Sequence, residues 1–318
     1  MDSKYQVSVI VCTYNPDWNK YKKTLRKFLQ QENIVFEIIV SDDGSKENYF
    51  EKVKQLFADY KFTDYKFVKN DVNVGTVKNY YGALLASEGE YTFALSPGDY
   101  VYDDYTLNNF YTFAKRKQAK ICFGNSVYYL PGKEIKLLQG QFNNPVNLQL
   151  FSDNADYQLQ KIGFYFANAI LGVSFFKRRD VAIEYTQRIL NVSKYVEDNT
   201  ALAFYYADNN KLFHYDAYVS WYEYGTGVST NKQEIWNKRL AQDFDNTYEL
   251  LKGNYPDDAI VDAAIIFHER KNKYIKALEL LLKHPVIFIQ FLYIKYFVPK
   301  VQVNFQPVNM ANFPKYED

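Results

Sequence analysis

Cysteine, histidine and long apolar runs are scarce in this chain of 318 residues. The two cysteines, Cys12 and Cys122, each lie in an apolar run that predicts a buried strand. Their spacing matches neither a metal site nor a disulfide framework, so we expect a reducing environment. No run reaches the roughly 18 apolar residues that a membrane-spanning helix requires, and residues 1–4 lack the apolar core of a signal peptide. We therefore expect a soluble, cytoplasmic protein.

An excess of either charge is absent too. Lys and Arg number 38, and Asp and Glu number 37, which leaves a net charge of +1. Without a strongly basic surface, we expect no nucleic-acid partner. Hydrophobic residues make up 47% of the chain, as in packed globular proteins, and the length suits one large domain or a domain with an extension.

Short apolar runs alternate with amphipathic stripes in the first 125 residues. Strands are predicted at 7–12, 36–40, 65–68 and 91–95, and helices between them at 18–29, 49–57 and 77–85. This alternation predicts a parallel sheet with helices on both faces and right-handed crossovers. Such sheets bind ligands where the strands end at their carboxyl edge.

The remaining residues are less regular. We expect a strand at 170–176 and a glycine-rich aromatic loop at 221–227. Helical stripes at 236–251 and 274–282 predict a C-terminal α-helical extension over 231–318. The apolar stretch 285–299 is too short to span a bilayer. We favour its packing against the main domain, with a homodimer contact or a peripheral membrane contact as alternatives.

The usual phosphate-binding loops are missing. Neither G-x-x-x-x-G-K-[ST] nor G-x-G-x-x-G follows the first strand. Carboxylates instead follow two predicted strands, at Asp42-Asp43 and at Asp99. A site that gathers carboxylates and holds a diphosphate needs a divalent cation between them, and oxygen ligands favour magnesium or manganese. A helix cap or a turn is the alternative role of the Asp42-Asp43 pair.

Four segments in order resemble the family 2 glycosyltransferases of the GT-A type. They are V-S-V-I-V-C-T-Y-N at 7–15, E-I-I-V-S-D-D-G-S at 37–45, N-V-G-T-V-K-N at 73–79 and S-E-G-E-Y-T-F-A-L-S-P-G-D at 87–99. The resemblance covers residues 7–125 well and extends more loosely to 230. It implies an α/β GT-A fold, doubly wound and mostly parallel like a Rossmann fold, over 1–230. The donor half would be 1–125 and the acceptor half 126–230.

The resemblance implies donor-binding roles for residues at the strand ends. The residues that match the nucleotide-binding positions are Thr13, Tyr14, Asn15, Asp42 and Asp43. The residues that match the segment flanking the diphosphate are Asn73, Gly75, Lys78 and Asn79. Asp42 matches the acid that reads the uracil edge. Lys78 stands where arginine is commoner, so a point charge replaces a bidentate fork.

The fourth segment departs from the family pattern. The family usually has an Asp-x-Asp-type cluster where this chain has Ser96-Pro97-Gly98-Asp99. Asp99 is therefore the one expected metal ligand, and Pro97 and Gly98 complete the donor-binding turn. We expect a divalent cation, Mn or Mg, bound more weakly than by a full cluster.

The catalytic base is expected in the acceptor half. Glu197-Asp198 matches the family's acid pair at a helix start, and Asp198 is the expected general base. A helix cap favoured by the dipole is the alternative role of this pair. The 221–227 segment matches the position of a mobile loop over the diphosphate, although core packing explains it equally well. His214 is expected to be structural rather than a metal ligand.

The resulting hypothesis is an inverting glycosyltransferase. It would move a sugar from a UDP-sugar to a hydroxyl of a glycan, lipid-linked or protein-linked acceptor. A non-catalytic scaffold subunit with the same fold is the first alternative, because the strand-four cluster is incomplete. A nucleotidyltransferase is the second, although it lacks a basic, glycine-rich loop after strand one. The protein would be cytoplasmic, with peripheral attachment to the inner face of the membrane as an alternative.

Overall fold

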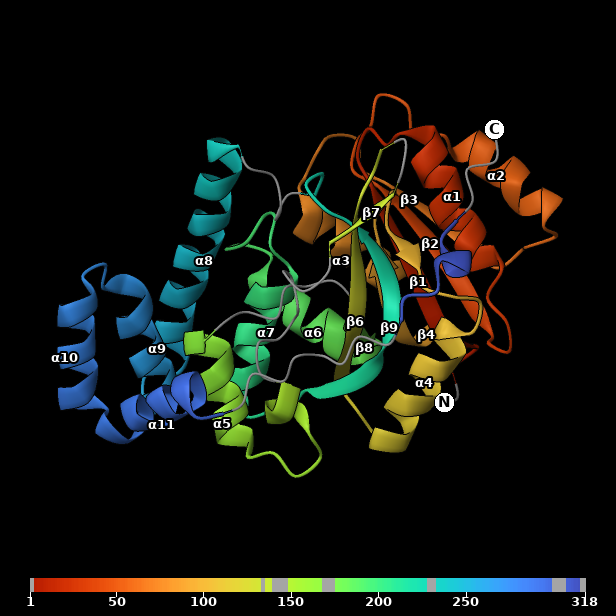
Figure 1. The fold of residues 1–318 in the computed structure, drawn as a ribbon. Helices are drawn as coiled ribbons and strands as arrows, with labels where there is room; N and C mark the ends of the chain where they lie inside the picture. The colour runs from red at the N-terminus through yellow and green to blue at the C-terminus, as the bar shows by residue number, and fades with distance from the viewer. Residues whose placement is uncertain are drawn as a thin grey trace.

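The computed structural model describes residues 3–132, 135–138, 148–167, 175–227, 233–298 and 307–314. A single mixed sheet runs through the centre of these residues, with helices on both faces and a group of C-terminal helices to one side (Figure 1). The strand order is β3-β2-β1-β4-β8-β6-β9-β5, and β7 pairs with β6.

Four parallel strands form the first half of the sheet, as predicted. Their registers place Thr13 beside Asp42 at the carboxyl ends of β1 and β2. Both neighbours of β1 run parallel to it, because helical crossovers return the chain to the same edge each time. These strands are β1 (Tyr5–Thr13), β2 (Phe36–Asp42), β3 (Tyr65–Lys69) and β4 (Gly89–Leu95).

The second half of the sheet is mixed. The strand β8 pairs antiparallel with both β4 and β6, whereas β6 and β9 run parallel to each other. The short strand β5 pairs antiparallel with β9. The strands are β5 (Tyr100–Val101), β6 (Ile121–Leu130), β7 (Lys136–Leu137), β8 (Phe175–Arg178) and β9 (Phe213–Glu223).

Alternate side chains of β1 enter different cores because successive strand residues point to opposite faces. Val9 lies in a cluster with Leu25 and Phe57, whereas Ile10 packs with Leu84. The helices on the Val9 face are α1 (Trp18–Leu29), α2 (Phe50–Asp59) and α4 (Thr106–Lys117). The helices on the Ile10 face are α3 (Thr76–Ala86) and α6 (Arg179–Ile189).

A third cluster joins the acceptor half to the C-terminal helices. The helix α7 is buried along its length and packs against α6 and α8. The preceding elements are η1 (Leu148–Phe151), α5 (Tyr157–Ile162) and η2 (Gly163–Ala167), followed later by α7 (Asp198–Ala207). The C-terminal elements are α8 (Glu234–Asn254), α9 (Ala259–Glu269), α10 (Lys273–Lys283), α11 (Pro285–Tyr296) and η3 (Met310–Asn312).

One expectation from the sequence needs correction, and another is described only in part. The segment 221–227 is not a loop throughout, because Trp221 to Glu223 belong to β9 and only the residues after Glu223 turn. Trp221 is fully buried, and its indole nitrogen donates to the Tyr102 carbonyl at 3.1 Å. The expected strand 170–176 is seen only in its last two residues, which begin β8, because 170–174 lie outside the described residues.

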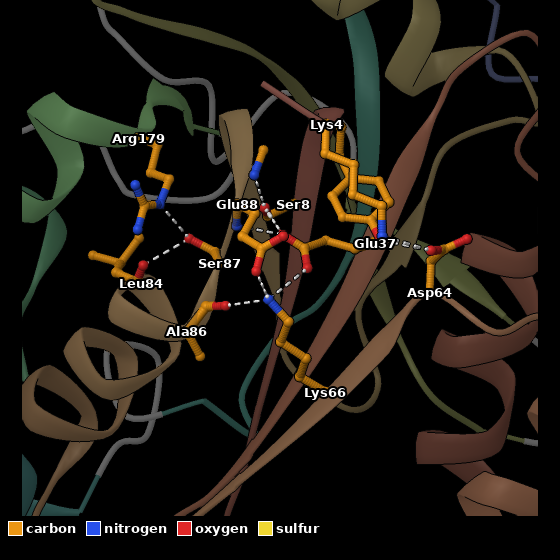
Figure 2. A network of polar contacts seen from close by, with 12 residues as sticks. Lys4, Ser8, Glu37, Asp64, Lys66, Leu84, Ala86, Ser87, Glu88 and Arg179 are labelled. Carbon is orange, nitrogen blue, oxygen red and sulfur yellow. Dashed lines mark hydrogen bonds and ion pairs between the residues drawn. The ribbon is translucent and has the colours of Figure 1, made fainter. Parts of the chain in front are cut away.

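A polar network joins the four parallel strands toward their amino ends (Figure 2). The Glu37 carboxylate is buried and accepts from the Ser8 hydroxyl at 2.6 Å and from the Glu88 amide. The Lys66 ammonium reaches Glu37 at 3.6 Å and Glu88 at 2.6 Å. The amino ends of these strands are therefore held together by hydrogen bonds and ion pairs. A ligand site is expected at the opposite, carboxyl ends of the strands.

Candidate functional site

The ends of β1 and β2 are tied together by Asp42. Its side chain is fully buried, and its two carboxylate oxygens accept from the Thr13 hydroxyl at 3.1 Å and the Ser45 amide at 2.9 Å. Asn15 has a left-handed backbone (φ +46°), and its backbone amide donates to the Ser45 hydroxyl at 2.7 Å. Tyr14, held between these anchors, is 55% exposed. The structure thus brings the predicted nucleotide-binding residues into one fixed corner with an exposed aromatic ring.

Asp43 fastens the next predicted segment to this corner. Its carboxylate accepts from the amides of Val74 at 2.7 Å and Gly75 at 3.0 Å. Gly44 has φ +73°, and a Cβ there would lie 2.6 Å from the Val72 carbonyl carbon. The two loops touch backbone to backbone, so Asp43 and Gly44 set the position of the 73–75 segment.

The amino end of α3 carries the residues expected near the diphosphate. Gly75 precedes the helix with φ +95° and no side-chain cap, while Asn73 and Lys78 are exposed. The amino end of a helix favours an anion, and here the Asp43 carboxylate already accepts from the Gly75 amide. Asn79, in contrast, is buried and bonds to the Ser41 hydroxyl at 2.7 Å, so its side chain ties α3 to β2.

Asp99 has a carboxylate neighbour that the sequence did not reveal. The Glu223 amide donates to Asp99 Oδ1 at 3.0 Å, and the Lys20 ammonium lies 2.5 Å from Glu223 Oε1. Gly98, at φ +104°, leaves no space for a side chain, because a Cβ would lie 2.8 Å from Glu223 Oε2. Glu223 follows Asp99 by 124 positions, and nothing but its place in the aromatic segment marks it.

Burial raises the pKa of the Asp99 carboxyl to about 7, and the negative charge of Glu223 adds to the rise. The described residues contain no group of three or more His, Cys, Asp or Glu that would hold a metal ion unaided. Two neighbouring carboxylates, of which Glu223 is paired with Lys20, fit a hard divalent cation, provided that the other ligands are diphosphate oxygens and waters. The donor set therefore suits a cation that arrives with its substrate.

Asp198 and Glu197 occupy different environments. Glu197 is bound by the Lys177 ammonium at 2.6 Å and the Thr186 hydroxyl at 2.9 Å. Asp198 opens α7 and accepts from the Asn199 amide at 2.8 Å. Burial raises the pKa of Asp198, and the charge of Glu197 raises it further. Asp198 therefore remains the candidate base, while Glu197 is held by Lys177 and Thr186.

The loop before Asp198 touches the donor segment directly. The Val77 amide donates to the Lys194 carbonyl at 3.1 Å, and a Cβ on Gly75 would lie 2.5 Å from the Lys194 side chain. Burial raises the pKa of the Cys12 thiol to about 12, and the charges of Asp43 and Glu197 both contribute. The acid pair, Glu197 and Asp198, therefore lies at the same end of the parallel strands as the β1–β2 corner.

A second residue missed by the sequence analysis holds this loop from the C-terminal extension. Asp243 of α8 is buried, and its Oδ2 accepts from the Tyr195 amide at 2.6 Å, the Val196 amide at 3.0 Å and the Ser193 hydroxyl at 3.0 Å. An aspartate in a helical stripe carries no local signal of such a role. It shows that α8 helps to position Asp198.

His214 does not join the site. It pairs with the Asn125 side chain at 2.9 Å and lies at the start of β9, whereas Glu223 ends that strand. Nine residues of extended chain separate the two by on the order of 25–30 Å. Burial lowers the pKa of His214 to about 4. The prediction of a structural histidine agrees with this placement.

The sequence profile described as "Glycosyl transferase family 2" matches residues 8–179. A search of curated protein sequences finds no match. Among solved structures, S. aureus TarS 1–349 in complex with UDP-GlcNAc aligns with a TM-score of 0.60 and 17% identity, covering 92% of this chain and 82% of that one. The same fragment in complex with UDP gives a TM-score of 0.53 and 16% identity, with 92% and 72% covered.

A mannosyltransferase, PcManGT from Pyrobaculum calidifontis in complex with GDP-Man and Mn2+, aligns with a TM-score of 0.52 and 13% identity, covering 92% of this chain and 86% of that one. At these identities the likeness concerns the fold alone. It confirms the predicted α/β GT-A fold with C-terminal helices.

Proposed function

Because the chain belongs to glycosyl transferase family 2, we propose that it moves a sugar from UDP to an acceptor hydroxyl with inversion at the anomeric carbon. Membership makes the chain a glycosyltransferase that uses a nucleotide-sugar donor. The observation that carries the proposal is the contact between Lys194 and Val77, which brings the loop of the candidate base, Asp198, to the segment of the donor diphosphate.

The nucleoside would occupy the β1–β2 corner. Tyr14 supplies an exposed ring for the base, and Asn15 and Thr13 line the same turn. Asp42 faces this corner with both oxygens already engaged, and a carboxylate oxygen retains a further lone pair. An acceptor of this kind suits the N3–H of uracil, and the choice of UDP rests on the match of Asp42 to the acid that reads the uracil edge in the family.

The diphosphate would lie between the start of α3 and the turn after β4. The exposed Lys78 and the amino end of α3 would offer positive charge from one side. Pro97 and Gly98 shape the other side, where Asp99 and Glu223 would hold a manganese or magnesium ion. Such a cation, when bound, neutralises the charge that develops on the leaving diphosphate.

Asp198 would take the proton of the acceptor hydroxyl as the oxygen bonds to the anomeric carbon on the face opposite to UDP. The environment of Asp198 keeps its carboxylate more basic than that of an exposed aspartate. Glu197 and Lys177 neutralise each other nearby and hold the helix start in place. The acceptor would enter between residues 126–230 and the extension 231–318, as a glycan, lipid-linked or protein-linked hydroxyl.

Calorimetric titration of UDP and GDP, each with and without manganese, tests the donor assignment. We expect UDP to bind, more tightly with manganese, and GDP to bind at least tenfold more weakly. A screen of UDP-sugars for UDP release then identifies the sugar, and NMR of the product gives its anomeric configuration. A product that retains the donor configuration contradicts the inverting mechanism. Binding of UDP without turnover of any donor on any acceptor supports the scaffold alternative.

A further inference from the structure

The helices α10 and α11 expose an unusual number of large apolar side chains. Single exposed apolar residues are common on proteins, whereas a concentration of them marks a contact surface. Of the 18 exposed large hydrophobic residues among the described residues, ten fall within 274–297. We name them the α10–α11 face: Tyr274, Ile275, Leu278, Leu281, Leu282, Val286, Ile289, Tyr293, Tyr296 and Phe297.

These helices are firmly attached to the protein on their inner side. Phe291 of α11 is buried against Phe166 and Phe267, with ring centroids 5.5 and 5.6 Å apart. Ile294 is fully buried, and α10 contributes Leu280 to the same core. Packing of 285–299 on the main domain is therefore present for α11, although residue 299 lies outside the described residues. The α10–α11 face remains apolar after that packing is complete.

Basic residues outnumber acidic residues along these two helices and the turn before them. Residues 270–297 contain six Lys or Arg and one acid, a net charge of +5, whereas the whole chain carries +1. The one acid, Glu279, is already paired with Arg270 at 2.6 Å and Lys283 at 2.9 Å. The basic residues are Arg270, Lys271, Lys273, Lys276, Lys283 and Lys295. An apolar face on helices that carry an excess of positive charge is complementary to a bilayer with anionic headgroups.

The composition of the face distinguishes a bilayer from a protein partner. Lys273 lies over the Tyr274 ring at 5.0 Å, and Lys295 lies over the Tyr296 ring at 5.1 Å. Tyrosine is enriched at membrane–water interfaces, and lysine reaches from apolar surroundings to headgroups through its long stem. Protein–protein interface cores, in contrast, are depleted in lysine.

Neither helix is long enough to enter the bilayer as a span. Among the described residues, no helix combines the length and apolar character that crossing a membrane requires. With 11 and 12 residues, α10 and α11 each extend about 17 Å. In Figure 1 they stand at the side of the molecule farthest from β3 and α2.

We propose that the α10–α11 face docks the protein on membranes that contain anionic phospholipids, with both helices lying flat in the headgroup region. The apolar side chains insert, and the lysines of these helices bind the lipid phosphates. Docking of this kind holds the enzyme at a bilayer without a spanning segment. The inference stands independently of the proposed donor and sugar.

Co-sedimentation of the full chain with vesicles tests the proposal. We expect binding to phosphatidylcholine vesicles that contain phosphatidylglycerol, and at least tenfold weaker binding to pure phosphatidylcholine or at high salt. The variant Tyr274→Ser/Leu282→Ser/Phe297→Ser should lose at least tenfold in affinity for the anionic vesicles. The control Val35→Ser/Tyr60→Ser removes exposed apolar side chains elsewhere and should bind like the wild type.

Unchanged UDP binding and thermal unfolding show that each variant is folded, since all five positions are exposed. Equal binding of wild type and triple variant to anionic vesicles overturns the proposal. So does a wild-type dimer, measured by light scattering, that the triple substitution converts to a monomer, because a second copy would then cover the face. A charge variant, Lys273→Gln/Lys295→Gln, should weaken vesicle binding. Its oligomeric state, measured by light scattering, should be the same as that of the wild type.

Discussion

At the scale of single residues, the neighbouring acids Glu197 and Asp198 illustrate how surroundings assign roles. Both carboxylate oxygens of Glu197 are engaged, one by the Lys177 ammonium and the other by the Thr186 hydroxyl. Asp198 is buried beside that negative charge, and its pKa is raised. We therefore expect Glu197 to position the start of α7 and Asp198 to accept the proton, because two carboxylates in different environments can take different roles.

The transfer rate should depend on pH through Asp198. Only the ionised carboxylate accepts a proton, and the pKa of Asp198 is raised. The rate should therefore fall as pH drops through that raised pKa, at a higher pH than an exposed aspartate would give. Measurement of kcat against pH at saturating donor shows the acid limb. A rate that stays flat down to the ordinary aspartate range contradicts this role.

Replacement Asp198→Asn should leave the fold at least as stable as the wild type at neutral pH. A carboxyl whose pKa is raised by folding binds protons more readily in the folded state, so its ionisation disfavours folding as pH rises. The neutral amide removes that cost. Thermal unfolding at neutral pH should show an equal or higher Tm, and a clear drop in Tm would indicate that the carboxylate is a structural cap.

At the scale of elements, much of the first half was predictable from periodicity. The apolar runs that became β1 to β4 and the stripes that became α1 to α3 are local patterns, and local patterns report which face is buried. The strand-end residues followed, because parallel strands deliver their carboxyl ends to one edge. Asp42 and Thr13 are adjacent for this reason.

The elements that escaped prediction depend on distant partners. The end of β9 reads as a turn because of its glycines and aromatics, yet Trp221 is buried by stacking on Tyr102 at 5.3 Å, more than a hundred residues away. Glu223 belongs to the candidate site because it contacts Asp99, which lies 124 positions earlier in the sequence. The apolar stripe of α10 resembles a core stripe in sequence, yet Leu278 and Leu282 face solvent. No local pattern distinguishes these cases.

The helix α8 should influence catalysis from outside the donor half. Asp243→Asn weakens three hydrogen bonds to the loop of Asp198, which we expect to cost about 2–3 kcal/mol in free energy of unfolding. The larger effect should be on kcat, with UDP affinity unchanged, because the base is displaced while the β1–β2 corner is intact. Kinetics and UDP titration separate the two.

The control is Asp245→Asn, which lies on the same helix at an exposed position. It should match the wild type in kcat and in UDP affinity. If Asp243→Asn reduces stability and leaves kcat unchanged, the C-terminal extension has no part in positioning Asp198.

At the scale of the whole molecule, the polar network and the candidate site lie at opposite ends of the parallel strands. The Glu37 network of Figure 2 lies toward the amino ends of the strands, and the candidate site lies at the carboxyl ends. Among the C-terminal helices, α8 contacts the loop before Asp198 through Asp243. The helices α10 and α11 expose the α10–α11 face. The polar network, the candidate site and the proposed docking surface therefore lie in separate parts of the molecule.

Glu37→Ala should be strongly destabilising, at about 3–5 kcal/mol, because it leaves the Ser8 hydroxyl, the Glu88 amide and Lys66 without their buried acceptor. Glu88→Gln removes a carboxylate from the same network at an exposed position and should change little. Denaturant unfolding of both variants checks the contrast. Equal effects of the two substitutions would show that burial of Glu37 is unimportant.

The most direct test of Asp198 as the general base compares wild type and Asp198→Asn in one assay of UDP release with the donor found by screening. We expect the variant to lose about 10²- to 10⁴-fold in transfer rate, while its calorimetric affinity for UDP stays within a factor of about two. The Glu249→Gln variant, an exposed acid-to-amide change, should match the wild type. Full transfer by Asp198→Asn, or loss of UDP binding with it, would contradict the assignment of the base.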